Sequence, residues 1–188
     1  MKQMGIFFDQ TRCTGCFTCS VACKDWYDID AGSENWMRIT AIENGEFPNL
    51  SLFYLAIACN HCADPPCVKA CPVNAITKRT EDGIVVVDQN LCLGKSECGS
   101  KCLKVCPWDA PQFTTDKNSK IRKCNLCIER LEQGKQTICV EACPMYALDV
   151  DWIENLQKKY GNSHVAEGFK YHEKFRPSII FKSKKRND

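Results

Sequence analysis

The chain has 188 residues, 16 of them cysteines, and a formal net charge of +2. This length corresponds to one domain or two small ones, and so many cysteines indicate either disulfides or metal-bound thiolates. No apolar run approaches the roughly 18 residues of a membrane-spanning helix, and so small a charge gives no support to a nucleic-acid-binding role.

The first residues show no export signal. Residues 1–9 lack the long apolar segment, the twin-arginine pair and the small-residue cleavage site of such signals. We therefore expect reduced, metal-bound thiols and a cytoplasmic protein. Export in the folded state with a signal-bearing partner is the alternative.

A strand followed by Asp-Gln and a cysteine loop occurs twice, at residues 6–15 and 85–94. The β-branched and aromatic residues before each loop are typical of a strand, and the small residues within it allow the backbone to approach a cluster closely. The repetition indicates a duplicated unit.

Other regular elements are expected to be few and short. Strands are predicted at residues 36–42 and 52–58, with turns between them. Residues 125–133 form a predicted short helix that the following glycine ends. A last helix begins near Asp151, where Glu154 completes a capping-box-like pair, and stops at the next glycine.

Four groups of four cysteines divide the chain. The first has the spacing C-x2-C-x2-C-x3-C, and the other three end in C-x3-C-P. In such a run three thiolates bind one [4Fe-4S] cluster and the fourth binds another. The groups are Cys13, Cys16, Cys19 and Cys23; Cys59, Cys62, Cys67 and Cys71; Cys92, Cys98, Cys102 and Cys106; and Cys124, Cys127, Cys139 and Cys143.

The total of sixteen thiolates corresponds to four [4Fe-4S] clusters, with no cysteine left for catalysis. Zinc sites usually take cysteine pairs from two knuckles and have no use for a recurrent C-x3-C-P. A disulfide scaffold fits less well still. We find no phosphate-binding loop, Ser-His-Asp set or credible carboxylate pair, so we expect an electron carrier without a catalytic site of its own.

In the order and spacing of these groups, the chain resembles the iron-sulfur subunits of dimethyl sulfoxide reductase, polysulfide reductase and formate dehydrogenase over nearly its whole length. The segments that carry the resemblance are 13–16, 59–62, 66–72, 106–112 and 123–144. It implies an α+β fold of two ferredoxin-like units, each for two [4Fe-4S] clusters, with one unit inserted in the other and long loops between sparse elements.

The same resemblance implies the domain limits. Residues 1–50 and 113–150 would form the outer ferredoxin-like half, and residues 51–112 the inserted half. Residues 151–188 would add a helix and a basic tail for partner docking. The alternative for the tail is solvated charge around one short strand at 179–181.

The resemblance also assigns the ligands to four sets. Set I is Cys13, Cys16, Cys19 and Cys143; set II is Cys23, Cys124, Cys127 and Cys139; set III is Cys59, Cys62, Cys67 and Cys106; and set IV is Cys71, Cys92, Cys98 and Cys102.

Set IV depends on the third group, which departs from the family. Relatives have C-x2-C-x2-C-x3-C-P there, whereas this chain has four extra residues, and Lys95 stands where the repeat places Cys16. We expect a [4Fe-4S] cluster on a rearranged loop. The alternatives are an empty pocket, a three-iron cluster or a zinc ion.

Two further kinds of residue could contact clusters. His61 lies between two cysteines, and we expect it to bond nearby backbone or a cluster sulfur rather than a metal. The tryptophans are expected to pack or to contact a partner rather than to relay electrons. They are Trp26, Trp36, Trp108 and Trp152.

The resemblance implies a subunit that carries electrons to or from a molybdenum or tungsten pterin catalytic subunit. That partner would be of the dimethyl sulfoxide reductase type or of the aldehyde ferredoxin oxidoreductase type, such as tungsten benzoyl-CoA reductase. A further electron carrier or redox subunit is also implied, and nucleic acid and direct membrane insertion are not. A free-standing polyferredoxin is the alternative, and a zinc-binding interaction module is a third.

Overall fold

Three small sheets organise the chain in the computed structural model, which describes residues 2–184. The largest has the order β6–β1–β7, formed by Leu148–Trp152, Met4–Asp9 and Ile179–Lys182. β6 runs antiparallel to β1, and β7 runs parallel to it. All six residues of β1 are buried, as expected for a central strand.

The other two sheets are two-stranded and antiparallel. β2 (Arg38–Asn44) pairs with β3 (Ser51–Ile57), and β4 (Ile76–Lys78) pairs with β5 (Val85–Val87). The predicted strands are therefore confirmed, with β2 beginning two residues later than expected.

Most helices are a single turn. Together they are α1 (Thr18–Trp26), α2 (Pro66–Ala70), α3 (Lys95–Cys98), α4 (Lys101–Lys104), α5 (Ile128–Leu131), α6 (Ile138–Glu141) and α7 (Ile153–Tyr160). No helix among residues 2–184 is both long and apolar enough to cross a bilayer. The expectation of sparse regular structure is confirmed.

Two predicted helix limits were wrong. α5 begins only at Ile128 because Leu126 and Cys127 have φ angles of 60° and 48°, which an α-helix cannot contain. The capping box at Asp151 is absent: this residue lies in β6, and the N-cap of α7 makes no side-chain hydrogen bond. Gly161, with φ 85°, ends α7 as predicted.

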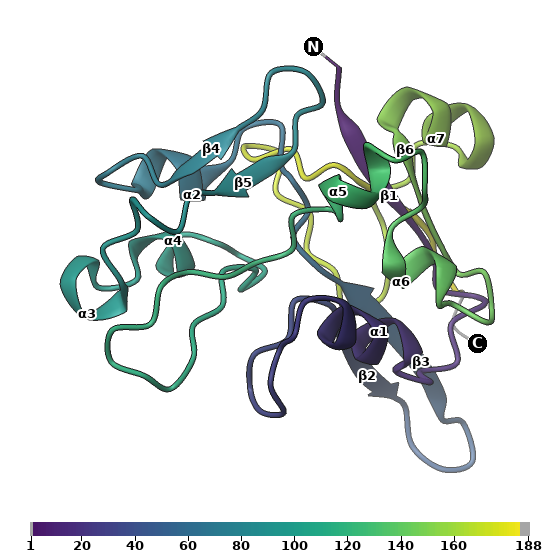
Figure 1. Ribbon diagram of the computed structural model, residues 1–188. Helices are drawn as coiled ribbons and strands as arrows, with labels where there is room; N and C mark the ends of the chain where they lie inside the picture. Colours follow the sequence, from purple (N-terminus) through teal and green to yellow (C-terminus); the bar gives the residue numbers. More distant parts are fainter. Residues whose placement is uncertain (1, 185–188) are drawn as a thin grey trace.

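The apolar core is divided between two lobes (Figure 1). In one lobe, the β6–β1–β7 sheet packs on the β2–β3 hairpin, and α7 covers its other face, where Phe7 stacks on Tyr160 at 3.6 Å between ring centroids. The second lobe contains α2, α3, α4, β4 and β5 around a small core that includes Ile76, Val85 and Ile121. Cysteines belong to both cores, so ligand loops take the place of ordinary core side chains.

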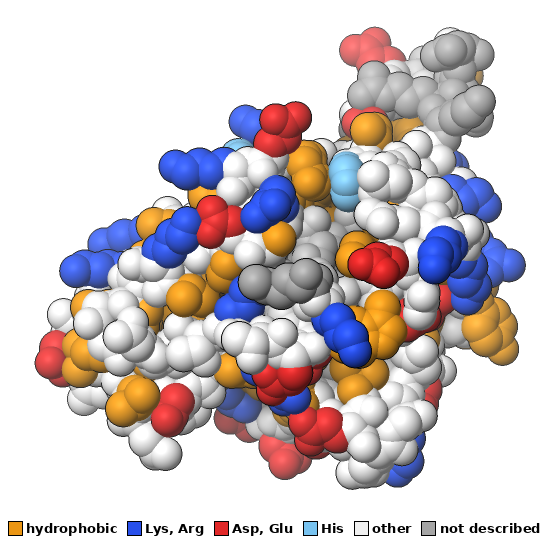
Figure 2. Space-filling view, turned by 90° about the horizontal axis from the view of Figure 1, so that it is seen from above, with side chains coloured by type: hydrophobic (Ala, Val, Ile, Leu, Met, Phe, Trp, Pro, Cys, Tyr) orange, Lys and Arg blue, Asp and Glu red, His pale blue; other side chains and the backbone are white. Residues whose placement is uncertain are grey.

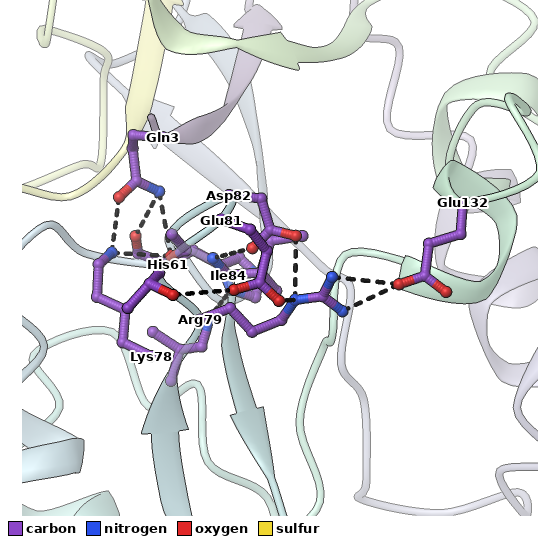
Figure 3. A network of polar contacts seen from close by, with 11 residues as sticks. Gln3, His61, Lys78, Arg79, Glu81, Asp82, Ile84 and Glu132 are labelled. Atoms are coloured by element: carbon purple, nitrogen blue, oxygen red, sulfur yellow. Dashed lines mark hydrogen bonds and ion pairs between the residues drawn. The ribbon is translucent and has the colours of Figure 1, made fainter. Parts of the chain in front are cut away.

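Polar contacts connect the lobes (Figure 3). Arg79, which follows β4, bonds Glu132 at the end of α5 at 3.2 Å, and Lys78 donates to Oε1 of Gln3 at 2.6 Å. Gln3 also donates to the carbonyl oxygen of His61 at 3.2 Å. Gln3, which directly precedes β1, is thus hydrogen-bonded to residues of the second lobe.

The C-terminal segment returns to the body of this chain. Its apolar residues 179–181 form β7 and are at most 1 % exposed, so the predicted short strand is confirmed and these side chains present no surface to a partner. Just before β7, the N–H of Ser178 donates to the carbonyl oxygen of Asn60 at 2.9 Å. Of the predicted basic tail, Lys185 and Arg186 lie outside the described residues.

Candidate metal centres

Four pockets in the protein are each lined by four cysteines, and every cysteine of the chain lines one of them. The groupings are those of set I, set II, set III and set IV. Residues more than a hundred positions apart, such as Cys19 and Cys143, therefore meet at one pocket. The geometry agrees with the ligand sets that the resemblance implied.

A recurrent turn directs the last cysteine of three groups. In the sequence from Cys71 to Ala75, Asn74 adopts φ 53° and the N–H of Ala75 donates to the sulfur of Cys71 at 3.2 Å. Such an N–H bond favours the thiolate form. The same turn, with φ 49° and N–H to sulfur distances of 3.4 and 3.3 Å, recurs at Cys106–Ala110 and Cys143–Ala147.

Hydrogen bonds reach other cysteine sulfurs as well. The N–H of Leu126 donates to Cys124 at 3.4 Å, and the hydroxyl of Thr18 donates to Cys16 at 3.3 Å. These contacts lower the charge density on a sulfur and are typical of sulfurs that bind iron.

Half of the sixteen cysteines are buried, and all but one of the others are half-buried. Burial, reinforced by neighbouring cysteines, raises the pKa of Cys19 and Cys102 to about 12. Cys16 is exposed, and hydrogen bonding from Thr18 lowers its pKa. A buried group of four thiolates requires compensating positive charge, which a bound iron cluster supplies.

The spacing of these side chains suits a multi-atom group better than a single ion. Within residues 2–184, no three His, Cys, Asp or Glu side chains converge closely enough to hold one metal ion. Each of the four pockets is instead lined by four cysteines together with mostly apolar side chains. Four cysteines around such a space fit a [4Fe-4S] cluster.

The extra residues of the third group bulge away from the set IV pocket. Gly94 has φ 87°, after which the N–H of Lys95 donates to the carbonyl of Ser119 at 2.9 Å and its ammonium donates to that of Thr114 at 2.6 Å. The bulge therefore rests on residues 114–119. The pocket keeps the same volume as that of set I, about 330 Å³, and its four cysteines.

The sets follow one another in the order I, II, III, IV. The charges of Cys139 in set II and Cys143 in set I both act on Cys19, and that of Cys59 in set III acts on Cys124 in set II. Sets III and IV are joined by α2, whose Cys67 lies one turn before Cys71. The four pockets thus form a chain.

His61 is completely buried, and its Nδ1 accepts the N–H of Val85 at 3.0 Å, which confirms the expected bond to nearby backbone. The tryptophan indoles bond protein groups: Trp36 donates to Glu34 at 2.8 Å, and Trp108 donates to the carbonyl of Lys170 at 3.1 Å. Sequence reasoning missed Lys123, which is buried at the set III pocket. Its only signal was its position directly before Cys124.

Comparison with known proteins identifies the type of cluster. Two models of the "4Fe-4S dicluster domain" match residues 12–76 and 50–152. One chain of the anaerobic dimethyl sulfoxide reductase from Escherichia coli (strain K12) is 40% identical over 96% of this chain and 88% of its own length. The probable anaerobic dimethyl sulfoxide reductase chain YnfG of the same strain is 41% identical with the same coverage.

A more distant relative is a subunit of sulfite dehydrogenase from Allochromatium vinosum, 32% identical over 52% of this chain and 47% of its own length. Together with the sixteen cysteines, these matches show a protein with four [4Fe-4S] clusters that serves electron transport.

Proposed function

This chain belongs to the family of iron-sulfur subunits of the anaerobic dimethyl sulfoxide reductase type, and on that premise we propose that it conducts electrons for a pterin catalytic subunit containing molybdenum or tungsten. The observation that carries the proposal is the line of four pockets, each with four cysteines. A [4Fe-4S] cluster in each pocket supplies one-electron chemistry. The substrate would bind to the partner.

Sets I, II, III and IV are the proposed ligands of one cluster each. Sets I and II combine residues 13–23 with residues 124–143, whereas sets III and IV lie within residues 59–106. This nesting supports the inserted arrangement of ferredoxin-like units, with 51–112 inside 1–50 and 113–150. The cytoplasmic location stays a prediction.

An apolar surface beside set I is the proposed docking site for the catalytic subunit. Phe17, Val21, Met145 and Tyr146 are 49, 64, 40 and 76 % exposed, and Cys16 is exposed among them. Aromatic and methionine side chains are enriched in protein interfaces. By contrast, the face in Figure 2 mixes charges of both signs with scattered apolar residues and has a row of Lys and Arg along one edge.

Anaerobic co-purification from the native source tests this function. A tagged chain should bring with it a large subunit that contains molybdenum or tungsten, with close to sixteen irons and little zinc in the small subunit. Adding that enzyme's oxidising substrate to the dithionite-reduced complex should oxidise all four clusters, as followed by electron paramagnetic resonance. Tungsten in the large subunit would favour the aldehyde ferredoxin oxidoreductase type.

A surface variant locates the contact. Tyr146→Glu should abolish co-purification while leaving the iron content unchanged, because a charge in a buried apolar contact is costly. Phe47→Glu is the control, since Phe47 is 88 % exposed in the β2–β3 turn. An iron-replete chain that purifies alone and reduces many partners would indicate a polyferredoxin instead, and a colourless zinc protein would indicate an interaction module.

A further inference from the structure

Lys123 is a buried cation for which the described chain supplies no carboxylate. It is 4 % exposed, and its ammonium donates to the carbonyl oxygens of Val85 and Cys124, each at 2.6 Å. None of the ion pairs within residues 2–184 includes it. An ammonium without a counter-charge is strongly disfavoured in a protein interior, so its negative partner must be the contents of the adjacent pockets.

Two cysteine sets surround this ammonium. Lys123 lines the set III pocket and directly precedes Cys124 of set II. Burial raises the pKa of Cys67, in set III, to about 12, and it raises the pKa of Cys124, in set II, well above its ordinary value. The positive charge of Lys123 lowers both pKa values and so counteracts part of each increase. A single positive charge therefore acts on two adjacent sets.

A [4Fe-4S] cluster with four thiolates carries a charge of about −2 when oxidised and about −3 after gaining one electron. We propose that Lys123 is a redox-tuning residue, whose buried ammonium stabilises the added electron on the set II and set III clusters. This inference rests on the proposed ligand sets. On this proposal, Lys123 raises the reduction potentials of the set II and set III clusters above the values they would have without it.

A second polar side chain points to the same pocket. Asn60 is 2 % exposed and lines the set III pocket, and neither its amide nitrogen nor its side-chain oxygen has a partner among the described residues. Its amide N–H groups are available to donate to a cluster sulfur, which also favours the reduced state. Lys123 and Asn60 thus both favour the reduced state of a cluster at set III.

Among the described residues, no buried cation lines the pockets of the other three sets. Lys101 lines the set IV pocket but is exposed, so water screens its charge. No charged side chain lines the pockets of set I or set II in the part of the chain that the structure describes. Lys123 lines the set III pocket and bonds the carbonyl oxygen of Cys124 in set II, so its charge lies beside the two inner sets.

A redox titration of the holoprotein tests this role. In Lys123→Met, which keeps most of the length of the side chain and removes the charge, the midpoint potentials of two clusters should fall and the other two should stay unchanged. The readout is electron paramagnetic resonance at poised potentials, with iron content measured on each sample. Lys123→Arg should restore the potentials toward those of the unaltered chain. Lys158→Met, an exposed position on α7 outside the four pockets, is the control and should change none of them.

Unchanged potentials in an iron-replete Lys123→Met protein, or an equal fall in Lys158→Met, would overturn the inference. If Lys123→Met loses iron, Lys123→Gln decides, because its neutral amide can still donate to the carbonyl oxygens that Lys123 bonds while the charge is removed. Unshifted potentials in an iron-replete Lys123→Gln protein would overturn the electrostatic account. An unaltered chain with few irons would count against the proposed function instead, so the two failures are distinguishable.

Discussion

Gly15 is the residue whose replacement should loosen the first cysteine loop most directly. It has φ 69°, and a Cβ atom there would lie 2.3 Å from the Tyr54 ring. The left-handed backbone costs an alanine about 1–2 kcal/mol, and overpacking costs about 1–3 kcal/mol more. Gly15→Ala should therefore destabilise the protein by roughly 2–5 kcal/mol.

Gly134 separates the two contributions, because it has φ 71° and nothing lies within 4 Å of its Cβ position. Gly134→Ala should incur only the backbone cost. In a chain of this size 1 kcal/mol lowers the melting temperature by about 2–4 °C, so Gly15→Ala should melt roughly 2–12 °C below Gly134→Ala.

Anaerobic melting, followed as the loss of cluster absorbance near 400 nm at one heating rate, measures this difference. In a Tyr54→Ala background, Gly15→Ala should cost no more than Gly134→Ala. Equal melting temperatures for the two glycine variants in the unaltered background would refute the role of Tyr54.

Four further outcomes are expected. Ile180→Ala should destabilise the protein by about 2–4 kcal/mol in the same melt, because Ile180 is fully buried beneath α7, whereas Val165→Ala at an exposed position should change it by less than about 0.5 kcal/mol. Tyr146→Asn should stabilise the isolated chain by up to about 1 kcal/mol, since φ is 49° there and asparagine tolerates it, but should weaken co-purification of the large subunit. After chelation of iron at pH 8, iodoacetamide should label the exposed Cys16 before the buried Cys19, and uniform labelling would show that the loops do not persist without metal. Because the raised thiol pKa values stabilise the metal-free fold below the ordinary thiol pKa of 9.0 and that stabilisation is lost as pH rises, circular dichroism of the metal-free chain should show alkaline unfolding.

The four groups of cysteines could be recognised because iron ligation imposes short, recurrent spacings that survive in the sequence. The partners of each set could be anticipated only through the family resemblance, since no local pattern connects Cys19 with Cys143. The bulge after Cys92 was foreseen as four extra residues. The contact of this bulge with residues 114–119 was not foreseen, because it depends on hydrogen bonds to backbone carbonyls, which carry no sequence signal.

Long-range packing explains what the sequence concealed. From the sequence, a lysine next to a cysteine is expected to lie at the surface. Lys123 is buried because β5 and the set III loop cover it. The helix at 125–133 failed for a different reason: the ligand loop requires left-handed backbone at Cys127, which side-chain propensity does not reveal. In both cases the ligand loops overrode the local preference.

The nested pockets also set an order of assembly on the ribosome. The ligands of sets III and IV have all been translated once residue 106 has been added, whereas sets I and II still await residues 124–143. Newly made chains can therefore complete the inner pair of ligand sets first and must hold Cys13–Cys23 open meanwhile. β7, which pairs with β1, follows all of these cysteines in the sequence, so the central strand becomes fully paired only after every cysteine of the four sets has been translated.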